Sequence, residues 1–207
     1  MSYAKILGDV RNYYDGKLEA HGPTARGVDW NSDESQRLRF SQLLKICDGD
    51  ADFTINDYGC GYGALVDCLA EDGRPFHYQG FDISAHMIAK AGELHPLNNA
   101  VFLSELSQLK PSDYTVASGI FNVRLQTDAR QWEEYVLETL EVIDRLSRKG
   151  FAFNLLTKYS DPEFMRPDLY YADPLFYFDY CKTRYSRFVS LLHDYPLYEF
   201  TMLVRKA

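Results

Sequence analysis

Apolar positions along this chain repeat with two periods, and the two periods alternate. Short apolar runs typical of buried strands occupy residues 53–59, 77–83, 100–106, 113–121 and 150–157. Between them, apolar residues three or four positions apart predict helices over residues 64–72, 84–94 and 131–148, the last ended by Gly150. This alternation predicts an α/β fold with a parallel sheet covered by helices on both faces.

The two ends of the chain depart from this alternation. Residues 1–20 carry apolar side chains at helical spacing, and a second helix begins where Asn31 and Glu34 stand in the relation of a capping box. Trp30 precedes this cap, as a hydrophobic staple would. Residues 188–207 predict two strands joined by a turn with no helix between them, so an antiparallel hairpin is expected to complete the sheet.

The stretch NDYGCGYGALVDCL places Gly59, Gly61 and Gly63 between the first predicted strand and the first helix of the alternation. Glycine permits backbone angles closed to other residues and lets a ligand approach without meeting a Cβ. Open α/β sheets bind ligands at this edge, where a helix start offers free N–H groups. Asp82 ends the second strand 19 residues after Gly63, where a carboxylate can accept both hydroxyls of a ribose. These features predict a cofactor that contains adenosine.

Two cofactor classes compete for this turn. Residues 59–64 match the G-x-G-x-x-A pattern, so an NAD-dependent oxidoreductase is one alternative. Asp57, two residues before the first glycine, argues against it, because a carboxylate repels a pyrophosphate and attracts an ammonium group. A phosphate-binding P-loop is excluded, because no G-K-[ST] follows the glycines.

The sequence D-x-G-x-G-x-G after the first strand, GFDIS at the second and the terminal hairpin together resemble the class I S-adenosylmethionine-dependent methyltransferases, and more loosely a subgroup of small bacterial ones. The resemblance runs from about Asp52 to the C-terminus. It implies a Rossmann-like, seven-stranded, mostly parallel sheet in the order 3-2-1-4-5-7-6, with strand 7 antiparallel and helices on both faces. It also implies S-adenosyl-L-methionine as the cofactor and S-adenosyl-L-homocysteine as its product.

The same resemblance assigns residues to the cofactor. Asp57 and the glycine turn would line its methionine part, and Asp82 would hold the ribose diol. The N-terminal segment would fold over the cofactor as a lid, with Arg26 on its carboxylate and Trp30 closing over it. The expected cofactor-binding residues are Asp57, Tyr58, Gly59, Cys60, Gly61, Gly63, Asp82, Ile83, Met87, Glu105, Leu106, Gly119, Phe121, Arg26 and Trp30.

Methyl transfer from a sulfonium needs alignment of the nucleophile and exclusion of water more than a fixed catalytic motif. The sixth strand should end at the same edge as the glycine turn, so His193 and Tyr195 are the candidate catalytic residues. For His193, a turn-capping role remains the alternative. Five aromatic residues of the segment 158–187 predict either an aromatic wall for a planar acceptor or ordinary core: Tyr170, Tyr171, Phe176, Tyr177 and Tyr180.

Length and charge narrow the function further. The 207 residues indicate a single domain, 1–207, with an N-terminal helical lid (1–50), a cofactor-binding core (51–157), an aromatic insert on the substrate side (158–187) and the hairpin (188–207). A net charge of −8 disfavours nucleic acid and anionic membranes as partners. The four cysteines have no disulfide or zinc spacing, and no signal peptide or membrane span is visible, so we expect a cytoplasmic protein without a metal.

The expected function is therefore transfer of a methyl group from S-adenosylmethionine to a small organic acceptor, planar or aromatic if the insert forms its wall. The NAD-dependent oxidoreductase and a non-catalytic member of the same fold are the alternatives. Methylation of RNA or protein is disfavoured by the acidity and by the sequence SGIF where many amino-group methylases of nucleic acids carry N-P-P-Y. The acceptor atom and the choice between monomer and homodimer stay open.

Overall fold

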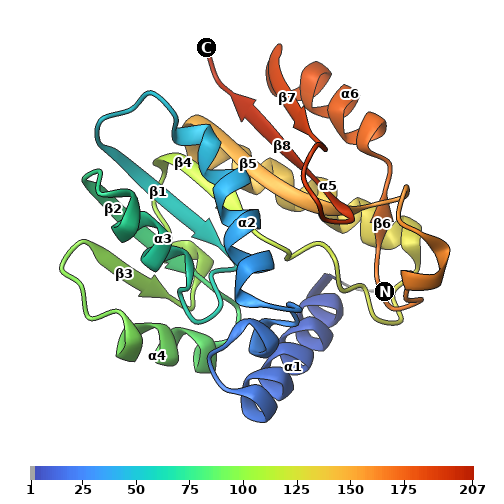
Figure 1. Ribbon diagram of the computed structural model, residues 1–207, viewed down its shortest axis with the longest axis horizontal. Coiled ribbons are helices and arrows are strands. Elements are labelled where there is room, and N and C mark those ends of the chain that lie inside the picture. Colours follow the sequence, from blue (N-terminus) through green and yellow to red (C-terminus); the bar gives the residue numbers. More distant parts are fainter. Residues whose placement is uncertain (1–2) are drawn as a thin grey trace.

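One mixed sheet forms the centre of the computed structural model, which describes residues 3–207 (Figure 1). Its strands follow the order β3-β2-β1-β4-β5-β8-β7, and β8 runs antiparallel to both β5 and β7. The short β6 pairs in parallel with the end of β5. The strands are β1 (Phe53–Tyr58), β2 (Phe76–Phe81), β3 (Ala100–Leu103), β4 (Ser112–Ala117), β5 (Ser147–Thr157), β6 (Tyr171–Ala172), β7 (Phe188–Leu192) and β8 (Glu199–Arg205). The predicted strand order is confirmed. Because β6 is an additional strand, the two hairpin strands predicted as 6 and 7 are β7 and β8.

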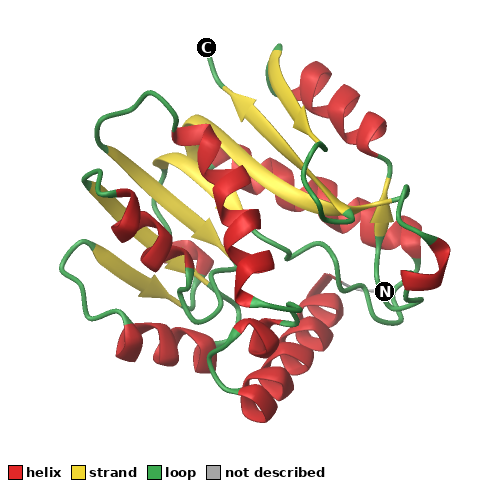
Figure 2. Ribbon diagram, in the orientation of Figure 1, coloured by secondary structure: helices red, strands yellow, loops and turns green. Residues whose placement is uncertain are grey.

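Helices cover both faces of this sheet (Figure 2). The helices α2 and α3 pack on one face through Leu43 and Leu65, whereas α5 and α6 pack on the other through Trp132 and Tyr177. The α-helices are α1 (Tyr3–His21), α2 (Asp33–Leu44), α3 (Leu65–Asp72), α4 (Ala85–Leu94), α5 (Ala129–Arg145) and α6 (Pro174–Arg184), and the 3₁₀ turns are η1 (Ala25–Val28), η2 (Lys45–Cys47), η3 (Leu106–Gln108) and η4 (Pro162–Phe164). None of the helices in residues 3–207 is long and apolar enough to cross a membrane.

Strand β5 explains why both faces have a core. Phe151 and Phe153 point into the cluster under α5 and α6, and Ala152 between them joins the cluster under α2 and α3. Successive side chains of a strand point to opposite faces, so an apolar run without polar interruptions is what a strand covered on both sides requires. Burial of these runs supplies most of the stabilisation of the sheet.

Several predicted boundaries were wrong. Helix α2 is capped by Ser32, whose hydroxyl accepts a hydrogen bond from Ser35 N at 3.2 Å while Ser32 N donates to Ser35 Oγ, so Asn31 and Glu34 do not form the box. Helix α5 ends at Arg145, and Gly150 lies inside β5 opposite Arg205, because residues 147–149 join the strand rather than extend the helix. Strands β3 and β4 stop three or more residues earlier than predicted. The predicted N-terminal helix is present from Tyr3, and residues 1 and 2 lie outside the described part.

Candidate functional site

The turn after β1 holds its three alternate glycines in left-handed backbone conformations, with φ of 85° at Gly59, 54° at Gly61 and 86° at Gly63. A Cβ at Gly59 would lie 2.2 Å from Ile120 Cγ2, and a Cβ at Gly61 would lie 3.1 Å from Val28 Cγ1. Backbone conformation and close neighbours therefore both require glycine in this turn.

Asp82 connects this turn to the end of β2. Its Oδ2 accepts a hydrogen bond from Gly61 N at 2.9 Å, and its Oδ1 accepts one from Ser84 N at 2.8 Å. Ser84 Oγ in turn donates to Asp15 on α1. Burial raises the pKa of Asp82 to about 6. The hydrogen bonds from the two backbone N–H groups oppose this rise, and the charge of Asp15 adds to it. Each carboxylate oxygen still has a lone pair for a further donor, such as a ribose hydroxyl.

Asp57 is the second carboxyl group of the site. Its Oδ2 accepts a hydrogen bond from Tyr78 OH at 2.8 Å, and the residue is only 2% exposed. Burial raises its pKa to about 7, the bond from Tyr78 opposes the rise, and the charge of Asp82 adds to it. A buried Asp57 and a partly exposed Asp82 in one cavity favour a cationic ligand and disfavour a pyrophosphate.

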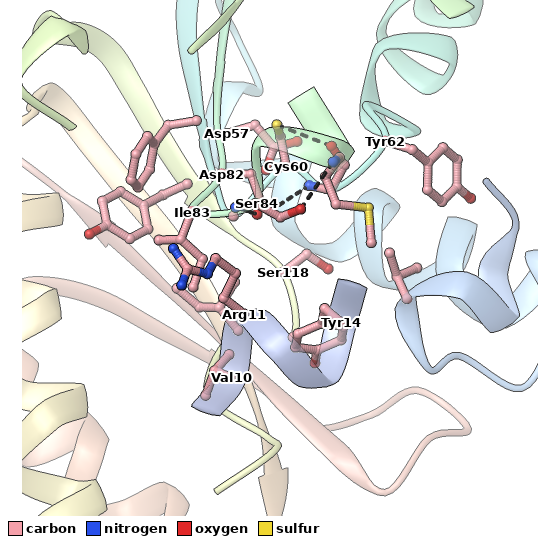
Figure 3. A pocket seen from close by; sticks show the side chains of 18 of the residues that line it. Val10, Arg11, Tyr14, Asp57, Cys60, Tyr62, Asp82, Ile83, Ser84 and Ser118 are labelled. Carbon is pink, nitrogen blue, oxygen red and sulfur yellow. Dashed lines mark hydrogen bonds between the residues drawn. The ribbon is translucent and has the colours of Figure 1, made fainter. Parts of the chain in front are cut away.

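A cavity lies between this turn and helix α1 (Figure 3). Figure 3 shows Arg11 and Tyr14 of α1 on the side of the cavity opposite Asp57 and Asp82. The α1 residues that line it are Tyr3, Leu7, Val10, Arg11 and Tyr14, which repeat at helical spacing along one face. The N-terminal helix therefore forms a wall of the cavity, although it precedes β1 by more than thirty residues. We name this space the cofactor cavity.

Most residues that the sequence assigned to the cofactor line this cavity: Asp57, Tyr58, Gly59, Cys60, Gly61, Asp82, Ile83, Met87, Leu106, Gly119 and Trp30. Four do not. Gly63 packs against His95 and Phe102, Phe121 is fully buried and accepts a hydrogen bond from Trp132, and Arg26 and Glu105 are exposed outside the lining. Their assignment to the cofactor stays a prediction.

The cavity also contains residues that no motif indicated. Ser118, at the end of β4, has a buried Oγ without a hydrogen-bond partner among residues 3–207. Burial raises the pKa of Tyr14, so its hydroxyl stays protonated and can donate. For Tyr14 the signal was available, because it continues the apolar face of the N-terminal helix. A single serine after a strand carries no comparable signal.

A second cavity, of about 480 Å³, adjoins the cofactor cavity. The two share Tyr14, Val28, Trp30 and Gly119 as lining residues. The indole of Trp30 lies so close to Gly119 that a Cβ there would be 2.2 Å from Cζ2. Trp30 is thus part of the boundary between the cavities, and its interpretation as a staple was wrong because the helix cap is Ser32.

A buried polar chain supports this boundary. The Arg39 guanidinium lies 3.8 Å from the centre of the Trp30 ring and donates from Nε and Nη2 to Glu199 Oε1 at 2.8 and 2.6 Å. Asn154 Nδ2 donates to Glu199 Oε2 at 2.5 Å, and Asn154 Oδ1 accepts from Gly119 N at 2.8 Å. One network therefore links α2, β8, β5 and the loop after β4.

The predicted catalytic residues lie at the hairpin turn and line neither cavity. His193 is exposed and its ring contacts those of Tyr159 and Phe200, while Tyr195 shares a hydrogen bond of 2.9 Å with Thr201 Oγ1. The next residues of the turn, Pro196 to Glu199, do line the second cavity. A catalytic role for His193 and Tyr195 stays a prediction.

The aromatic segment divides between core and cavity. Tyr170 and Tyr177 are buried under α5, with their hydroxyl oxygens 3.2 Å apart. Tyr171 lines the second cavity, whereas Phe176 and Tyr180 line neither cavity. The core interpretation is therefore correct for Tyr170 and Tyr177, and a role of Tyr171 as a wall for an acceptor stays a prediction.

Comparisons with known proteins agree on one family. A family model described as a methyltransferase domain matches residues 56–153. The protein Rv1506c of Mycobacterium tuberculosis (strain ATCC 25618 / H37Rv), whose provisional name is that of a methyltransferase, is 50% identical over 165 residues, which are 79% of this chain and 99% of that protein.

Solved structures of methyltransferases share the fold at low sequence identity. Magnesium protoporphyrin IX methyltransferase from Synechocystis PCC 6803, with bound SAM, has a TM-score of 0.67 and 16% identity, covering 97% of this chain and 96% of that one. The small RNA methyltransferase HEN1 has a TM-score of 0.60 and 16% identity, covering 83% of this chain and 25% of that one. The fold is therefore shared by enzymes with unlike acceptors.

Proposed function

This chain belongs to the class I S-adenosylmethionine-dependent methyltransferases, and from that premise we propose that it methylates a small organic molecule bound in the second cavity. The observation that supports the acceptor site is the contact between the two cavities. They meet at Tyr14, Trp30 and Gly119, so a ligand in the second cavity would adjoin the end of the cofactor cavity.

The residues of the cofactor cavity fit S-adenosylmethionine. The glycine turn leaves a cradle that a Cβ would fill, and Asp82 has free lone pairs for a ribose diol. Asp57 is a buried acid suited to an ammonium group. Ser118 Oγ, without a partner among the described residues, is available to a polar group of the ligand.

When bound, the cofactor would supply a methyl group activated by its sulfonium. That methyl would pass to a lone pair of the acceptor, its former bonding electrons would remain with sulfur, and any proton displaced from the acceptor would be released to solvent with the product. The chain contributes alignment and exclusion of water. Val28 packs on Gly61, and Asp29 next to it is held by Lys17 at 2.6 Å and by Tyr13 OH at 2.7 Å. The N-terminal segment acts in this proposal as a lid over the reacting groups.

Size and charge favour a small acceptor. A cavity of about 480 Å³ falls in the range of small-molecule sites. The net charge of −8 opposes the broad phosphate contacts on which RNA binding depends.

Partial filling of the second cavity tests this proposal. Leu156→Trp should leave S-adenosylhomocysteine affinity within about twofold in calorimetry, because Leu156 lines only the second cavity. With tritiated S-adenosylmethionine and a bacterial extract split into low-molecular-mass, RNA and protein fractions, the unmodified protein should label the low-mass fraction, and the variant should lose at least 90% of that label. Leu175→Trp, at an exposed position on α6 outside both cavities, is the matched control. Label in RNA or protein alone would contradict the proposal.

A further inference from the structure

The charged groups that line the second cavity are all paired within the protein. Arg39 binds Glu199, and Asp29 is held by Lys17 with Arg166 Nη1 at 3.6 Å. Arg166 also donates to Asp168 from Nε at 3.1 Å and from Nη2 at 2.5 Å. A carboxylate, phosphate or ammonium group of an acceptor would therefore find no uncompensated charge to replace its lost hydration.

One uncharged polar group of this cavity does lack a partner. Asn122 is 4% exposed and lines the second cavity. Its Oδ1 accepts a hydrogen bond from Leu156 N at 3.2 Å, which fixes the orientation of the amide. Its Nδ2 is buried and has no hydrogen-bond partner among residues 3–207. A buried unsatisfied donor is costly, so an oxygen that reached Nδ2 would recover that cost.

The position of Asn122 suits an acceptor. Its N–H donates to Gly119 O at 3.3 Å, and Gly119 lines both cavities. Asn122 is therefore one hydrogen-bonded turn away from Gly119, at which the two cavities meet. Its carbonyl oxygen also accepts from Tyr170 N at 2.8 Å, so the residue is held from both sides.

The rim of the second cavity has a different character. Phe164 is 63% exposed and Tyr198 is 41% exposed, and their ring centres lie 5.9 Å apart across two segments of the chain. Both residues line the cavity. Exposed aromatic rings beside a pocket favour an apolar or aromatic ligand portion, which they can contact on its faces.

We propose that the acceptor is a neutral molecule whose carbonyl or hydroxyl oxygen accepts a hydrogen bond from Asn122 Nδ2 and whose apolar portion contacts Phe164 and Tyr198. This inference rests on the methyl transfer to a small acceptor proposed above. It excludes organic acids, phosphorylated compounds and primary amines, and it assigns Asn122 a role in selecting and orienting the acceptor.

Three naphthalene probes of nearly equal shape test, on the unmodified protein, whether a neutral ligand is preferred to a charged one. They are 2-naphthalenemethanol, 2-naphthoic acid and 2-naphthylmethylamine. In calorimetry with saturating S-adenosylhomocysteine at pH 7.5, the neutral alcohol should bind at least tenfold more tightly than the acid or the amine. Equal or tighter binding of either charged probe, or no binding of the alcohol, overturns the inference. Neither result depends on the folding of a variant.

Asn122→Asp tests the amide itself, because it keeps an oxygen for Leu156 N and replaces the donor by a carboxylate oxygen, which repels an acceptor oxygen. The variant should lose at least tenfold in affinity for 2-naphthalenemethanol and keep its S-adenosylhomocysteine affinity within twofold. Asn98→Asp is the matched control, since Asn98 is exposed and lines neither cavity, and it should change neither affinity. Unchanged alcohol affinity in Asn122→Asp overturns the inference. Label in the RNA or protein fraction of the extract experiment would instead contradict the proposed function.

Discussion

The cofactor cavity and the second cavity differ in how the chain builds them. The floor of the cofactor cavity comes from residues directly after β1, β2 and β4, in segments of a few residues each. The second cavity combines α1, the segment after η1, α2, the loop after β4, the end of β5 and the turn before β8. Local sequence can therefore specify most of the first cavity, whereas the second exists only once the whole sheet has assembled.

The two cavities also treat charge differently. Asp57 is buried and Asp82 is partly exposed, neither forms an ion pair within residues 3–207, and both have a raised pKa. On the other side, Arg39 and Glu199 neutralise each other in the interior. The acids of the cofactor cavity favour a cationic ligand, whereas the paired charges of the second cavity favour neither a cation nor an anion.

The largest effect should come from breaking the ion pair on the acceptor side. Arg39→Met leaves Glu199 buried without its partner, which should cost about 3–5 kcal/mol in the free energy of unfolding. Urea denaturation measures this cost. Arg37→Met is the control, because Arg37 lies on the same helix in an exposed pair with Glu71 and should cost less than about 1 kcal/mol. Equal losses in the two variants would show that the buried pair has no special role.

A smaller effect is expected on the cofactor side. Asp82→Ala removes the oxygens that accept from Gly61 N and Ser84 N and that would hold the ribose. Hydrogen bonds to a charged group contribute about 1.5–3 kcal/mol, so S-adenosylhomocysteine affinity should fall about 100-fold. Asp52→Ala, at an exposed position before β1, should leave the affinity unchanged in the same titration. An unaltered affinity in Asp82→Ala would mean that the ribose lies elsewhere.

A still smaller effect is expected for the pH dependence of S-adenosylhomocysteine affinity, which involves only the cofactor cavity. S-adenosylhomocysteine affinity should rise about tenfold from pH 5 to pH 8, because Asp57 and Asp82, with pKa values of about 7 and 6, must lose their protons to attract an ammonium group. Asp57→Asn should flatten most of this rise. Calorimetry across the pH range provides the measurement, and a rise of the same size in Asp57→Asn would contradict the role of Asp57.

The free energy of unfolding of the ligand-free protein should fall as pH rises, opposite to the expected rise in S-adenosylhomocysteine affinity. Because burial raises both pKa values in the folded state, the unfolded chain loses these protons near pH 4 and the folded chain only near pH 6–7. The contribution of these acids to stability is therefore greatest below pH 4, falls as pH rises to about 7 and is constant above it. Asp57→Asn should accordingly be more stable than the unmodified protein at pH 8, by on the order of 2 kcal/mol.

Sequence reasoning succeeded where a short pattern determines a local geometry. Three alternate glycines predicted the turn, and the carboxylate at the end of β2 was predicted to hold a ribose, whereas its hydrogen bond from Gly61 N was not predicted. Helical spacing predicted α1 but not which surface it would cover. Trp30 lines the cofactor cavity as expected, whereas Phe121 is buried outside its lining, because a large aromatic residue near a strand end can face a cavity or the core, and only its neighbours decide.

The sequence by itself determined the alternation of strands and helices, the glycine turn and the acids beside it, since these depend on hydrophobic period, backbone freedom and residue spacing. The order of the strands followed from the family resemblance. Tertiary structure alone decided that Arg39 would meet Glu199 and that Asn122 would keep a donor beside the second cavity with no partner among residues 3–207. Arg39 and Glu199 are 160 positions apart, and no local pattern relates them. Their meeting depends on how α2 packs against the far edge of the sheet, which the cores on both faces determine together.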